Sequence, residues 1–140
     1  MKVRTTFYSG KQIVLFVGSC AILSQHLAAL CHGYGLSFES FSSFSELAAE
    51  SLPPAPSLLI VDRGTTGASG DTIHWWSEKL GKRSAIILFG TPEFVEDLGA
   101  ELFSPHLNQL LMVSGSIESL ERAIVGVVRV FRESFGTAIG

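Results

Sequence analysis

The chain has 140 residues, a length that fits one domain with a single buried core. Hydrophobic residues make up 46% of it and charged residues only 16%, which excludes a disordered chain and leaves room for some apolar surface that a partner covers. The formal net charge is −3 and the basic residues are scattered, so the sequence offers no nucleic-acid-binding surface.

Location follows from hydropathy and from the two cysteines. No apolar run reaches the roughly 20 residues that a membrane-spanning helix needs, and residues 1–10 lack the pattern of a signal peptide. Cys20 and Cys31 fall on one predicted helix, about 16 Å apart, which is too far for a disulfide. Unpaired thiols are typical of a reducing compartment. We therefore expect a cytoplasmic protein without membrane contact.

The first predicted strand is residues 13–17, a continuous apolar run of the kind that is buried on both faces of a sheet. Gly18 and Ser19 end this strand. Ser19 is also a suitable N-cap for the helical pattern that follows, and Gly33 and Gly35 end that helix.

A half-exposed strand is predicted for residues 36–41, where apolar and polar residues alternate. Ser43 or Ser45 can cap the short helix behind it. The three prolines within residues 53–56 exclude a helix there and form a stiff linker.

A second fully apolar strand spans residues 58–61, and Asp62 follows it directly. The next segment, residues 63–70, is a turn-rich loop with three glycines. Asp71 can cap the helix that comes after this loop, and Gly81 terminates that helix.

The last part of the chain continues the alternation. Residues 85–89 form a third apolar strand that ends at Gly90, and Thr91 followed by a proline predicts the start of another helix. Residues 109–113 are predicted to be the last strand, and Ser116 begins a long amphipathic helix.

Five strands that alternate with five helices indicate an α/β fold, in which parallel βαβ units place helices on both faces of one sheet. We expect one domain over residues 11–135, with a lead-in or linker at 1–10 and a tail at 136–140. In such sheets, binding and chemistry occur at the carboxyl ends of the strands.

The order of these elements resembles a response-regulator receiver domain over roughly residues 11–133. The best local match is residues 56–70, where a proline and a buried strand precede Asp62, and Gly67 and Gly70 form a Gly-x-x-Gly loop. The resemblance implies a five-stranded parallel sheet in the order 2-1-3-4-5, with Asp62 at the phosphoacceptor position. From the residues alone, Asp62 could equally cap its loop by accepting hydrogen bonds from backbone amides.

The residues that would serve such a phosphoacceptor differ from the family pattern. Aspartyl phosphorylation needs Mg²⁺, which receivers hold with further carboxylates at the end of the first strand. In this sequence no Asp or Glu precedes Glu39, and Val17 and Gly18 stand at the matching positions. We therefore expect no Mg²⁺ site and no other metal or cofactor.

Two further positions of the pattern are also changed. Gly90 corresponds to the family's Thr or Ser at the fourth strand, with Thr91 adjacent, and Val113 or Ser114 stands where receivers have a lysine. Losing one group that stabilises transition-state charge typically costs about 2.7–4 kcal/mol. We therefore expect Asp62 to be inactive as a phosphoacceptor and the domain not to be an enzyme.

Two apolar features are candidate contact surfaces. Trp75 and Trp76 are adjacent on a predicted helix, so one can enter the core while the other is at least partly exposed. Ordinary helix packing explains such a pair, and so does an anchor for a partner. On the last helix, Val125 and Val130 lie off the main apolar stripe.

The expected function is a non-enzymatic receiver-like domain of a two-component system that acts by protein contact. By resemblance, the partner is a histidine kinase core or another two-component domain, and the last helix is a possible homodimer surface. The short segment from Tyr8 to Lys11 resembles a junction in hybrid sensor histidine kinases. Two alternatives stay open: an atypical receiver that is phosphorylated on Asp62, and a domain that senses a small ligand at the strand-end crevice.

Overall fold

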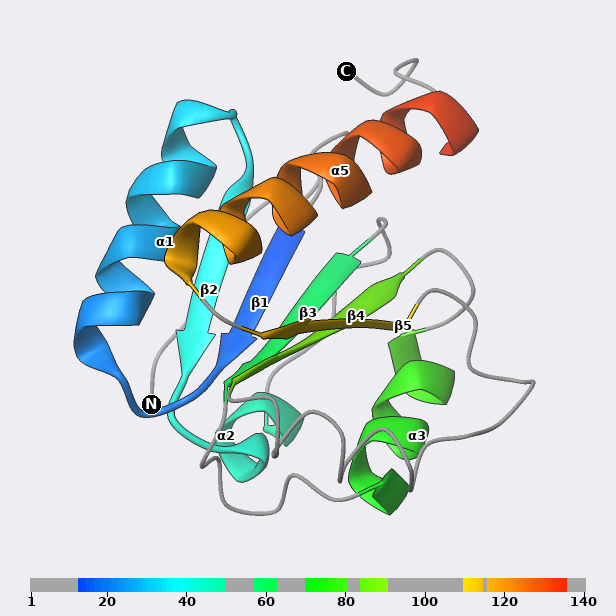
Figure 1. Cartoon of the computed structure of the whole chain (residues 1–140). Coiled ribbons are helices and arrows are strands. Elements are labelled where there is room, and N and C mark those ends of the chain that lie inside the picture. Colours follow the sequence, from blue (N-terminus) through cyan, green and yellow to red (C-terminus); the bar gives the residue numbers. More distant parts are fainter. Residues whose placement is uncertain are drawn as a thin grey trace.

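The computed structural model describes residues 13–49, 57–62, 70–80, 84–90, 110–114 and 116–135. Its strands are β1 (Ile13–Val17), β2 (Ser37–Phe41), β3 (Ser57–Asp62), β4 (Ala85–Gly90) and β5 (Leu110–Ser114). Its helices are α1 (Ala21–Gly33), α2 (Phe44–Ala48), α3 (Gly70–Leu80) and α5 (Ile117–Phe135). The strands are parallel and lie in the order β2-β1-β3-β4-β5 (Figure 1). The predicted fold class and strand order are confirmed.

Several predicted segments lie outside the described residues. They are the lead-in at 1–10, the tail at 136–140, the proline linker, most of the loop that follows Asp62, and the helix expected to start at Thr91.

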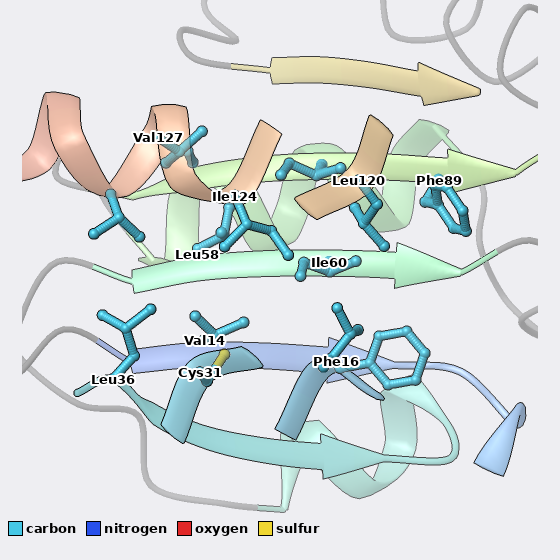
Figure 2. Packing of buried hydrophobic residues seen from close by; sticks show 14 of the residues in the cluster. Val14, Phe16, Cys31, Leu36, Leu58, Ile60, Phe89, Leu120, Ile124 and Val127 are labelled. Atoms are coloured by element: carbon cyan, nitrogen blue, oxygen red, sulfur yellow. The ribbon is translucent and has the colours of Figure 1, made fainter. Parts of the chain in front are cut away.

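The helices form a layer on each face of the sheet: α1 and α5 cover one face, and α2 and α3 cover the other (Figure 1). Alternate residues of the central strands point to opposite faces, so each strand contributes to two separate cores. We call these the α1/α5 core and the α2/α3 core. The α1/α5 core includes Val14, Phe16, Leu27, Leu58, Ile60, Ile87, Phe89, Leu120 and Ile124 (Figure 2). The α2/α3 core includes Ile13, Leu15, Val17, Leu47, Leu59, Val61, Ile73, Trp76 and Leu88. Because these strands are buried on both faces of the sheet, their sequences are continuous apolar runs.

Two of the predicted helix starts are confirmed by hydrogen bonds. At α2, the Ser43 hydroxyl accepts from the backbone N–H of Glu46 at 3.2 Å, and a Glu46 carboxylate oxygen accepts from the backbone N–H of Ser42 at 3.2 Å. The Ser42 hydroxyl donates to the same carboxylate, and these bonds lower the pKa of Glu46. At α5, the hydroxyl of Ser116 accepts from the backbone N–H of Ser119 at 3.3 Å.

Two other predicted caps were wrong, by one residue at α1 and by two at α3. Cys20, and not Ser19, is the N-cap of α1, and its side chain makes no capping bond. Helix α3 already begins at Gly70, so that Asp71 lies in its first turn instead of before it. A carboxylate in that turn still interacts favourably with the helix dipole.

The end of α1 is closed by Gly35, which has a φ of +71°. The next amide, the N–H of Leu36, donates to the carbonyl of Cys31 at 2.8 Å, as in a Schellman motif. Gly35 is therefore the residue that ends α1 and turns the chain into β2, whereas Gly33 is still part of the helix.

The two cysteines differ in their surroundings, and both are free thiols. Cys20 is exposed, while Cys31 is fully buried in the α1/α5 core. Burial raises the pKa of the Cys31 thiol to about 12, so at pH 8 only about one thiol in ten thousand would be a thiolate.

In the native protein at pH 8, we expect iodoacetamide to alkylate Cys20 and to spare Cys31, because only the thiolate reacts and the buried sulfur is inaccessible. Peptide mapping by mass spectrometry measures both sites. Denaturation in urea is the control and should expose both. Rapid alkylation of Cys31 in the folded chain would contradict its burial.

None of the helices in the described part of the chain is both long and apolar enough to span a bilayer.

Candidate functional site at the carboxyl end of the sheet

Asp62 is the last residue of β3 and is buried, with 7% of its surface exposed. Its Cα partner on β4 is Phe89, and the partner of Phe89 on β5 is Val113. Asp62 follows Ile60 by two positions and therefore belongs to the sheet face that α1 and α5 cover. Phe89 and Val113 both pack in the α1/α5 core. A carboxylate is thus held at the edge of an apolar core.

Gly18 lies directly against Asp62. Its N–H donates to the carbonyl of Phe41 at 2.9 Å, which extends the pairing of β1 and β2 by one residue. A Cβ built on Gly18 would lie 2.6 Å from the Cβ of Asp62 and 3.2 Å from its Oδ2. It would also lie 2.8 Å from Cζ of Phe16. Position 18 therefore has no room for any side chain unless its neighbours shift.

This close approach bears directly on the acids that the family resemblance implies. An aspartate at position 18 would have to force apart the backbone-anchored Cβ of Asp62 and the ring of Phe16. Asp62 and Phe16 thus fill the space that a side chain at position 18 would use.

Val17, the other position matched to a first-strand acid, does not face Asp62. Its side chain is fully buried in the α2/α3 core, on the opposite face of the sheet. Of the two positions predicted from the sequence, only Gly18 is a neighbour of Asp62.

The predicted site positions on β4 and β5 differ in whether they lie level with Asp62 across the sheet. Gly90 is buried and pairs with Ser114, one residue beyond the row that contains Asp62. Val113 lies in that row and is half-buried. Of the two candidates for the place of the family's lysine, Val113 is the one in register with Asp62. Thr91 lies outside the described residues.

Sequence reasoning missed two aromatic residues of this site, Phe16 and Phe89. Both lie toward the carboxyl ends of their strands (Figure 2). Phe16 is fully buried and its ring reaches Gly18, while Phe89 is the cross-strand neighbour of Asp62. The period-two alternation could have found them, because Phe16 precedes Gly18 by two positions and so shares its face.

The expected absence of a Mg²⁺ site stays a prediction. This ion requires six oxygen ligands in near-ideal octahedral geometry, and protein sites normally supply them from one or two carboxylates together with water and substrate phosphate. Gly18, Phe89 and Val113, which lie beside Asp62 or in its row across the sheet, offer no side-chain oxygen. No group of three or more His, Cys, Asp or Glu with metal-binding geometry occurs in the described segments.

The sequence matches no family model and no curated protein. The structure, in contrast, is similar to solved receivers. A response regulator from Colwellia psychrerythraea gives a TM-score of 0.65 at 16% identity, over 87% of this chain and 98% of that one. A response regulator receiver protein from Sinorhizobium medicae WSM419 gives 0.63 at 12%, over 87% and 95%. The beryllofluoride-activated NtrC4 receiver domain dimer gives 0.57 at 14%, over 86% and 97%. This chain has the receiver fold.

Within this receiver fold, the two tryptophans of α3 have different surroundings. Trp76 is 3% exposed and belongs to the α2/α3 core, while Trp75 is 52% exposed. Their rings meet edge to face with centroids 4.8 Å apart, and Trp76 also stacks on Phe44 at 6.4 Å. This division is the one expected of adjacent positions on a helix. A role for Trp75 in partner contact stays a prediction.

Helix α5 presents apolar surface on the other side of the molecule. Ile124, Val127 and Val128 are buried against the sheet, Val125 is half-buried, and Val130 is 48% exposed. One polar contact also joins α5 to α1, between Nε2 of His26 and a carboxylate oxygen of Glu121. Contact with a partner through Val125 and Val130 remains a prediction.

Proposed function

We propose that this chain is a non-enzymatic, receiver-like signalling domain of a two-component system, which works by protein contact and in which Asp62 accepts no phosphoryl group. The observation that supports this most directly is the contact between Gly18 and Asp62. It leaves the buried carboxylate without room for an acidic neighbour on β1.

The physical argument concerns charge. Phosphoryl transfer depends almost entirely on positioning and on electrostatic stabilisation of the transferring group. The first-strand acids and the lysine of the receiver pattern are replaced by Val17, Gly18 and Val113. At about 2.7–4 kcal/mol for each lost group, two losses would slow the transfer by at least about four orders of magnitude.

The surfaces available for contact support the second half of the proposal. Val130 on α5 is exposed and apolar, and such side chains become stabilising when a partner covers them. The NtrC4 receiver in its beryllofluoride-activated form is a dimer. For this chain we propose cytoplasmic contact through α5, either with a second copy or with a histidine kinase core or another two-component domain.

The decisive experiment offers the domain a phosphoryl group. We expect no mass increase on incubation with acetyl phosphate and Mg²⁺, measured by intact-mass spectrometry beside an active receiver. Asp62→Asn is the matched control. A gain of one phosphate in the native chain that is absent from Asp62→Asn would establish the alternative, a phosphorylatable receiver.

The contact half of the proposal needs a separate measurement. Analytical ultracentrifugation of the native chain and of Val130→Asp tests self-association, and calorimetric titration with histidine kinase cores tests partner binding. We expect at least one of the two to occur without phosphorylation and to weaken in Val130→Asp. A monomer that binds no kinase core would contradict it.

A further inference from the structure

A shallow groove lies between α2 and the first half of α3, on the face of the sheet opposite to α1 and α5. Its volume is about 380 Å³, in the range of small-ligand and side-chain pockets. The aromatic part of its lining comes from Phe44, Trp75 and Trp76, and the polar part includes Asp71 and Thr72. The groove is therefore mainly apolar, with Ser45 on the α2 side and Asp71 and Thr72 on the α3 side as its polar groups.

The spacing of these residues on α3 brings unlike groups together. Asp71 and Trp75 are four positions apart and so are neighbours on one face of the helix, as are Thr72 and Trp76. The exposed carboxylate of Asp71 is thus beside the exposed indole of Trp75. An aromatic face and a carboxylate side by side are the two elements that recognise a cationic side chain with an apolar stem.

Charge on the described parts of α2 and α3 favours a cation. Asp71 is the charged residue among the described lining, which includes no Lys or Arg. Beyond the lining, Glu46 and Glu78 are exposed carboxylates and Lys79 is the one exposed lysine of these helices. The partial positive charge at the start of α3, about half a unit, offsets only part of the full charge on Asp71.

The Trp75 ring already contacts one cation of the protein itself. Nζ of Lys79 lies 5.8 Å from the centroid of the Trp75 ring, within the range of a cation–π interaction. Lys79 is not among the residues that line the groove. The indole is therefore presented to solvent in a position that a cation can reach.

We propose that the groove between α2 and α3 binds an arginine-containing segment of a partner protein. The aliphatic stem would pack between Phe44 and Trp75, and the guanidinium would pair with the Asp71 carboxylate and stack on the Trp75 indole. Arginine fits better than lysine because its planar group can do both at once. The proposal does not depend on the state of Asp62, which lies on the other face of the sheet.

The test uses a defined probe, the tripeptide acetyl-Leu-Arg-Leu-amide, with its uncharged citrulline analogue as control. Titration into the ¹⁵N-labelled chain, followed by NMR, should give saturable shifts of the Trp75 indole and of the Asp71 and Thr72 amides. We expect a dissociation constant in the millimolar range, as for one side chain in an open site. The citrulline peptide should bind at least about threefold more weakly.

Three variants locate the contact. Asp71→Asn and Trp75→Leu should each weaken binding about threefold, from the loss of an exposed ion pair and of a cation–π contact. Glu78→Gln makes the same charge change on α3 outside the lining and should weaken binding less than Asp71→Asn does. Asp71 and Trp75 are exposed, and circular dichroism checks that their variants remain folded.

Three results would overturn the proposal. The first is the absence of saturable shifts at Trp75 and Asp71 with the arginine peptide. The second is equal binding of the citrulline peptide, which would make the groove a general apolar surface. The third is concentration-dependent shifts of the same residues without peptide, which would assign the groove to a second copy of the chain.

Discussion

Replacing Gly18 by alanine is expected to lower the free energy of unfolding by about 1–3 kcal/mol, the usual cost of forcing an extra carbon into a packed interior. The added Cβ would lie 2.6 Å from the Cβ of Asp62 and 2.8 Å from the ring of Phe16. The ring can turn aside, but the Cβ of Asp62 is fixed to the backbone of β3. Urea unfolding followed by circular dichroism measures the change.

Gly126 provides the matched control. It is an exposed glycine inside α5, and a Cβ built on it meets nothing within 4 Å. Gly126→Ala should therefore raise stability by about 0.5–1 kcal/mol, because alanine is the better helix former. If Gly18→Ala behaved like Gly126→Ala, the close contact with Asp62 would be refuted.

A double-mutant cycle separates the neighbours of position 18. In a chain with Asp62→Gly, the Cβ that blocks position 18 is gone, so Gly18→Ala should cost less than in the native chain. Asp62→Ala keeps that Cβ and removes only the carboxylate, so it should restore little. Equal coupling in both backgrounds would show that the carboxylate oxygen, and not the Cβ, limits the space.

Trp76→Ala is expected to be the most damaging change on the opposite face, with a loss of about 3–5 kcal/mol as for other buried large aromatics. Trp76 is 3% exposed and contacts both Phe44 and Trp75 in the α2/α3 core. Natural domains are stable by only about 5–15 kcal/mol. The variant should therefore unfold at much lower urea concentration than the native chain.

Trp75→Ala is the matched variant, since it removes the same atoms from the next position. Trp75 is 52% exposed, so the loss should be about 1 kcal/mol or less, from its edge-to-face contact with Trp76. The difference between the two variants also reports on function. A large effect of Trp75→Ala on stability would mean that the residue is structural and would weaken its assignment as a contact residue.

The sequence predicted the framework well because its strongest signals are physical requirements of this fold. The apolar runs at 13–17, 58–61 and 85–89 became β1, β3 and β4 because central parallel strands are buried on both faces. Ser43 and Ser116 were found because a hydroxyl at an N-cap satisfies a specific orphan amide.

The site was only partly predictable. The alignment of strand ends brought Gly18 and Asp62 together, since neighbouring parallel strands finish at the same edge. The sequence said nothing of how closely they approach, because that depends on the twist and spacing of β1 and β3 in the folded sheet. Val17, the other position matched to a first-strand acid, faces away from Asp62, because its place in the alternation of β1 turns its side chain toward the α2/α3 core.

The contact between Gly18 and Asp62 makes these two positions epistatic. The side chains that position 18 can accept depend on the residue at position 62 and on the rotamer of Phe16. An acid could therefore not be placed at position 18 by one substitution alone. A smaller residue in place of Phe16 would not be enough, because the Cβ of Asp62 would still lie 2.6 Å from the new Cβ. The ends of β1 and β3 would also have to move apart.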